Sequence, residues 1–84
     1  MDDWKDIKER LIEALFVSQL TQPDVGEINV LIEAGEFQVA LEFLCTQIFE
    51  RELEPTAEQR RDLESLGQQL EVSVPRLLGD PWAT

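Results

Sequence analysis

Histidine and tyrosine are absent from this chain of 84 residues, and cysteine occurs once, at Cys45. Without histidine there is no imidazole for acid–base catalysis or metal binding, and a cysteine–histidine nucleophile is excluded. A single cysteine cannot form an internal disulfide and is typical of a reducing cytoplasm. The chain also lacks a glycine-rich phosphate loop and an Asp-x-Asp calcium loop. We therefore expect no catalytic residues, no cofactor, no metal and no enzymatic activity.

Positive charge is scarce as well, with 7 lysines and arginines against 18 aspartates and glutamates, a net charge of −11. Nucleic acids and anionic membrane surfaces are bound through clustered basic side chains, so neither is an expected partner. No segment approaches the roughly 20 apolar residues that span a bilayer, and the acidic start Met1–Lys5 has no signal-peptide core. These features predict a cytoplasmic protein whose complementary partner is a basic protein or a cationic ligand.

The hydrophobic residues that are present, 43% of the chain, suffice for one packed core in a single domain. They recur every three or four residues from Trp4 to Leu15, which predicts a helix over about 3–19. The apolar face widens at Phe16 and Val17, so we expect this helix to meet more than one neighbour.

A second helix is predicted over about 23–34. Pro23 suits the first turn of a helix because its missing N–H has no intrahelical partner there, and Thr21 or Gln22 can cap it. The helix is expected to end at Gly35, a residue that readily adopts the left-handed conformation after a C-terminus. So short a connection predicts an antiparallel hairpin with the next helix.

The third predicted helix, about 36–51, is the most apolar part of the chain. Hydrophobic residues on nearly every side describe a central helix that is packed by neighbours all round. Cys45 lies within this segment, and no basic residue near it in sequence could stabilise a thiolate. We therefore interpret Cys45 as a buried structural residue.

A fourth helix is predicted over about 57–70, because Thr56 and Gln59 match the capping-box pattern ahead of a leucine stripe. Two prolines and a glycine exclude a long helix after it. The expected fold is thus an all-α, compact four-helix domain with a short irregular C-terminal tail at 72–84. The apolar residues of the tail are expected to fold back over the bundle, with Trp82 as an anchor.

The acidic excess is the positive functional signal. A charge of −11 on so small a domain carries a self-repulsion cost. We interpret it as serving recognition, with a merely solvated surface as the simpler alternative. The candidates are glutamates around the hairpin of the second and third helices and a polar stripe at spacings of four on the third helix. A solvated acidic loop is favoured over weak divalent-cation binding at the exit of that helix. The predicted partner-binding residues are Glu33, Glu36, Glu42, Thr46, Glu50, Glu52 and Glu54.

Four short motifs follow one another along this hairpin: Gly35-Glu36, Ala40-Leu41-Glu42, Leu44-Cys45 and Ile48-Phe49-Glu50. In this order they resemble the MafI-type immunity proteins of bacterial polymorphic toxin systems. The likeness extends from about Asp24 to Leu70. The chain departs from the family at Phe49, where tyrosine is frequent, and in the tail from Val72 onward.

The resemblance implies a small cytoplasmic immunity protein that neutralises the toxin domain encoded beside it by stoichiometric occlusion. The charge adds that the covered toxin face is basic, for example the substrate cleft of a nuclease. Glu36, Glu42 and Glu50 are carried over as motif positions. Two alternatives remain: a small acidic helical adaptor or regulator without a toxin partner, and a self-assembling subunit that dimerises through the tail. We expect a monomer or a weak homodimer.

Overall fold

The computed structural model describes residues 4–80 of the chain. Within this range every regular element is a helix, which confirms the expected all-α class. The four long helices begin and end within two residues of their expected bounds, and a short fifth helix follows them. They are α1 (Trp4–Val17), α2 (Asp24–Glu33), α3 (Phe37–Glu50), α4 (Ala57–Leu70) and α5 (Val74–Leu77).

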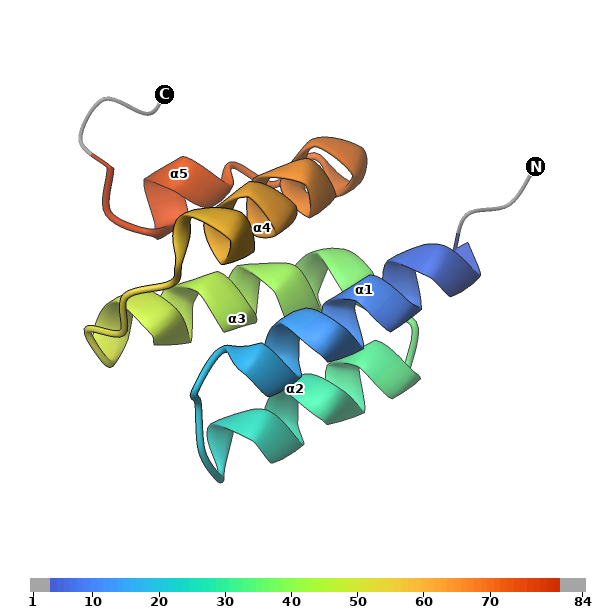
Figure 1. Cartoon of the computed structure of the whole chain (residues 1–84). Coiled ribbons are helices and arrows are strands. Elements are labelled where there is room, and N and C mark those ends of the chain that lie inside the picture. Colours follow the sequence, from blue (N-terminus) through green and yellow to red (C-terminus); the bar gives the residue numbers. More distant parts are fainter. Residues whose placement is uncertain (1–3, 81–84) are drawn as a thin grey trace.

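Helix α3 lies at the centre of the fold and contacts the other four helices (Figure 1). In this view α2 runs below α3, α4 and α5 lie above it, and α1 crosses in front. Five side chains of α3 are buried in the hydrophobic core, as expected for a central helix. One face of α3 nevertheless stays at the surface, so the expectation of packing all round is wrong there. The buried residues are Ala40, Leu41, Leu44, Cys45 and Ile48.

The start of α4 carries the predicted capping box. The Gln59 N–H donates to the Thr56 Oγ1 at 3.1 Å, and the Thr56 N–H donates to the Gln59 Oε1 at 2.9 Å. These bonds pair two backbone N–H groups at the start of α4, a region where the first turn leaves such groups without intrahelical partners. The Gln59 Nε2 also donates to the Val17 carbonyl oxygen at 3.1 Å. The capping residues thus fix the start of α4 against the end of α1.

Hydrogen bonds at both ends of α2 involve residues that the sequence indicated for helix capping. Pro23 precedes the helix as its N-cap residue and does not lie in the first turn as predicted. Gln22, rather than Thr21, supplies a side-chain bond there, because its Oε1 accepts from the Gly26 N–H at 3.1 Å. At its end Gly35 has a φ of 80°, and the Glu36 N–H donates to the Leu31 carbonyl oxygen at 2.9 Å. That bond is typical of a Schellman turn and confirms the role predicted for Gly35.

The segment after α4 is more regular than expected. Val74–Leu77 forms α5, which contacts α3 and α4, and Val72 and Val74 are buried in the core. Pro75 is accommodated because it lies in the first turn of α5, where a missing N–H breaks no helical bond. The expectation of an irregular tail is therefore wrong for this part. The anchor predicted at Trp82 lies outside the described residues.

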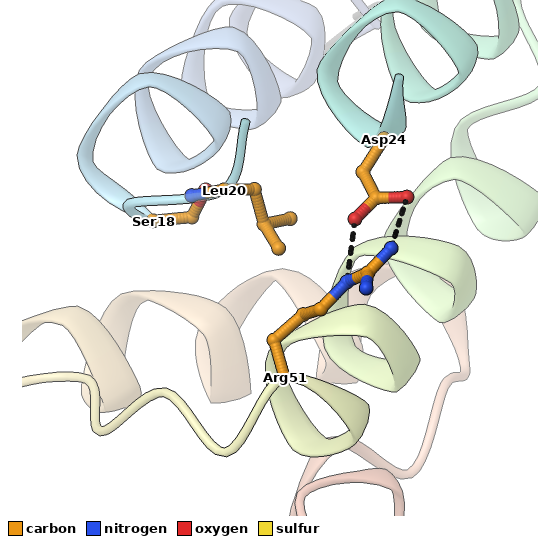
Figure 2. Close-up of polar contacts among 4 residues, drawn as sticks. All are labelled: Ser18, Leu20, Asp24 and Arg51. Atoms are coloured by element: carbon orange, nitrogen blue, oxygen red, sulfur yellow. Dashed lines mark hydrogen bonds and ion pairs between the residues drawn. The ribbon is translucent and has the colours of Figure 1, made fainter. Parts of the chain in front are cut away.

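Asp24, at the start of α2, is 6% exposed, and its carboxylate is held by the guanidinium of Arg51 at the end of α3. Arg51 Nε donates to Oδ2 at 2.9 Å, and Nη2 donates to Oδ1 at 3.3 Å (Figure 2). Each charge also has the favourable sign for its helix end. The bond to Asp24 raises the pKa of Arg51 above its ordinary value. This ion pair joins the start of α2 to the end of α3, in agreement with the predicted antiparallel hairpin.

We expect Arg51→Ala to lower the melting temperature by several degrees, because it leaves the buried Asp24 carboxylate without its cation. Asp24→Ala removes that carboxylate, so the double variant should lose less stability than the sum of the two single variants. Thermal denaturation followed by circular dichroism measures all three. Additive losses would show that the two side chains are not energetically coupled.

Candidate functional site

The predicted site residues do not form one cluster. Glu33 and Glu36 lie beside the turn between α2 and α3, whereas Glu52 and Glu54 lie in the loop after α3. The 14 residues of α3 separate the two groups by about 20 Å along the helix axis. Glu33 is also ion-paired, its Oε1 lying 3.3 Å from the Lys8 Nζ of α1. A single contact patch therefore has to lie at one end of α3 or along its face.

The face of α3 that remains at the surface carries the predicted polar stripe. Glu42 and Glu50 are exposed, and Thr46 between them is half-buried. Two apolar residues share this face at helical spacing, Val39 at 43% exposure and Phe49 at 53%. The α3 face, as we name these five residues, combines carboxylates with an exposed aromatic ring. Glu52 and Glu54 extend its charge into the following loop.

The carboxylates of the α3 face form no salt bridge in the described part of the chain. Arg51, the basic residue nearest to Glu50 and Glu52 in sequence, forms its salt bridge with Asp24, and Glu50 adds only a smaller electrostatic attraction. Of the other cations, Lys8 pairs with Glu33 and Arg60 pairs with Glu64 and Asp80. The negative charge at the exit of α3 is therefore not neutralised by ion pairs within residues 4–80.

A cleft of about 510 Å³ lies between α1 and α4 and was not predicted. Its base is formed by core side chains, those of Ile48, Leu63 and Leu66. The rim is polar, and Val17 contributes an apolar edge from the end of α1. The polar lining residues are Arg10 and Glu13 of α1, Ser18 directly after it, Thr56 at the start of α4, and Glu58, Gln59 and Asp62 within α4.

The end of α1 carries apolar side chains that are not all buried. Phe16 is 79% exposed and Val17 is largely exposed, whereas Leu15 is buried in the core. The prediction that this helix meets more than one neighbour is confirmed, because α1 contacts α2, α3 and α4, but Phe16 itself stays at the surface. One helix can direct only part of its circumference at the core, and successive residues are about 100° apart around it.

Cys45 is buried in the core, as predicted. Burial raises its pKa to about 12, because the core cannot solvate a thiolate. The thiol is therefore protonated near neutral pH and is a poor nucleophile.

No group of three or more acidic, cysteine or histidine side chains that could hold a metal ion occurs within residues 4–80. Glu50, Glu52 and Glu54 thus do not converge on one point, although they alternate in sequence. Among the described helices, none has the length and apolar character required to cross a bilayer.

Comparisons of the chain with protein-family models, with curated proteins and with solved structures gave no match.

Proposed function

We propose that this protein is a cytoplasmic immunity protein that binds a basic toxin domain and blocks it by stoichiometric occlusion. The observation that carries the proposal is the α3 face, whose exposed carboxylates form no salt bridge in the described part of the chain. A basic protein surface would supply the missing counter-charges. The motifs that resemble the immunity family also lie along α3 and the turn before it.

The two kinds of residue on the α3 face would contribute differently to binding. Carboxylates accelerate encounter with a basic partner, and their effect falls as salt is added. Affinity comes mainly from desolvated anchors, which are enriched in aromatic side chains. Phe49, half-exposed beside Glu50, is the anchor of the α3 face. The ring lies against Gly79, so its position on the surface is supported from below.

Co-expression with the adjacent upstream reading frame tests the proposal. A toxic neighbour whose toxicity is relieved, with recovery of a one-to-one complex, is the expected result. Toxicity without rescue or complex, or a harmless neighbour, would contradict it and return the protein to the class of small acidic adaptors.

We expect the double substitution Glu42→Lys and Glu50→Lys to reduce the association rate for the toxin domain by at least about tenfold at low salt. The reason is that two attractive charges on the α3 face become repulsive. Stopped-flow association kinetics at several salt concentrations measures the effect, and the difference from the unmodified protein should shrink as salt rises.

The matched control is Glu9→Lys with Glu71→Lys, which changes the net charge equally at exposed sites outside α3. This variant should slow association much less. Equal slowing by both pairs would show that only the overall charge matters and that the α3 face is not the interface.

A further inference from the structure

The cleft between α1 and α4 has the features of a second binding site. We propose that it receives a short basic segment of a protein partner, in which a large apolar side chain is flanked by lysine or arginine. The proposal does not depend on the α3 face. It follows from the shape of the cleft, the residues at its base and the charge of its rim.

The base of the cleft is lined by apolar core side chains, each only 1–3% exposed. Ile48, Leu63 and Leu66 belong to the hydrophobic core, yet all three line the cleft. Val17, 44% exposed, extends this apolar surface toward the rim. A volume of about 510 Å³ lies within the range of pockets that bind compact ligands, roughly 300–1,000 Å³. One large apolar side chain and part of its neighbours fit such a space.

The rim selects the charge of the occupant. Glu13 of α1 and Glu58 and Asp62 of α4 line the cleft, are exposed, and have no ion-pair partner in the described part of the chain. Glu58 and Asp62 are four residues apart and therefore project from the same side of α4. Arg10 is the single cation of the lining. Three carboxylates against one guanidinium favour a basic segment and disfavour an anionic ligand.

A second copy of this chain is a poor occupant for the same reason. Each copy carries a net charge of −11, so two copies repel one another before any contact forms. A basic segment of another protein meets no such barrier. Arg10 then offers N–H donors to the main-chain carbonyl oxygens of the bound segment.

The cleft and the α3 face lie on different sides of α3. Ile48, at the base of the cleft, is about 200° around the helix from Thr46 in the middle of the α3 face. A short segment bound in the cleft therefore leaves the helical part of the α3 face uncovered. A negative result for the cleft would leave the immunity proposal intact, and a negative result for the immunity proposal would leave the cleft proposal intact.

The test uses a synthetic peptide in which three arginines alternate with two leucines, with both ends blocked. It is titrated into isotope-labelled protein at about 0.15 M salt, where distant charges are screened, and amide chemical shifts are recorded. We expect the shifts to concentrate on residues of the cleft, such as Val17, Ser18 and Gln59. Glu58→Gln with Asp62→Gln should weaken binding about tenfold, since two charge contacts are lost.

Two further variants separate the cleft from general charge effects. Ala14→Leu adds volume to the lining without changing the charge and should also weaken binding. Glu9→Gln with Glu71→Gln removes the same charge outside the cleft and should leave affinity nearly unchanged. Shifts centred on the α3 face, equal weakening by both pairs of substitutions, or equally tight binding of a peptide with glutamate in place of arginine would each overturn the proposal.

Discussion

Leu44→Ala is expected to lower the free energy of unfolding by about 3–5 kcal/mol, because Leu44 is 0% exposed in the central helix. The substitution removes buried apolar groups and leaves a cavity where α3 meets its neighbours, which can close in only partly. A domain of 84 residues is stable by roughly 4–13 kcal/mol, so the loss is a large fraction of the total. Urea denaturation followed by helical circular dichroism measures it.

Val39→Ala provides the control within the same helix. Val39 is 43% exposed on the α3 face, so its truncation should change the free energy of unfolding by less than about 0.5 kcal/mol. A loss at Val39 as large as that at Leu44 would mean that α3 is not packed as the structure has it.

Much of the fold follows from local patterns in the sequence. The periodic leucines and isoleucines locate the four long helices, and Thr56, Gln59 and Gly35 mark helix ends whose bonding the structure confirms. Such features depend on residues within one or two turns of each other, so a sequence reveals them directly. The short helix α5 was not predictable in this way, because four residues contain too little periodicity.

The candidate surfaces were harder to predict, because they depend on distant segments. The sequence grouped Glu36 and Glu54 as neighbours of one hairpin, but the length of α3 places them at its opposite ends. The cleft needs the approach of α1 to α4, which are far apart in the chain. A signal for it existed: Arg10, Ala14 and Val17 recur at helical spacing beside the core stripe of α1. Without the position of α4, however, these three residues do not indicate a cleft.

The exposure of aromatic residues was also not predictable from the sequence. Sequence hydrophobicity predicts burial for Phe16 and Phe49 alike, yet both are largely exposed. A small domain cannot bury every apolar side chain, since its surface is large relative to its volume. Phe49 lies at the edge of α3 among carboxylates, which is why it, rather than the isolated Phe16, is the anchor of the proposed interface.

Gly67→Ala is expected to lower the free energy of unfolding by about 2–3 kcal/mol, although alanine normally stabilises a helix relative to glycine by up to about 1 kcal/mol. Gly67 is buried in α4, where a Cβ atom would lie 2.5 Å from the Val72 carbonyl oxygen and 2.6 Å from the Val74 Cγ2. The Val72 N–H also donates to the Gly67 carbonyl oxygen at 2.8 Å, so the backbone here is held in place. Relief of the clash therefore requires α5 to move away from α4. Chemical denaturation gives the free energy.

Gly26→Ala is the matched control, since Gly26 also lies within a helix. A Cβ atom there would meet only the end of the Gln22 side chain, at 2.8 Å, and that side chain can rotate away. Its movement loses the bond that caps α2, which offsets the gain in helix propensity. The net change should stay below about 1 kcal/mol. If Gly67→Ala were equally mild, the segment 72–77 would not be packed on α4, and the four long helices would form the domain without it.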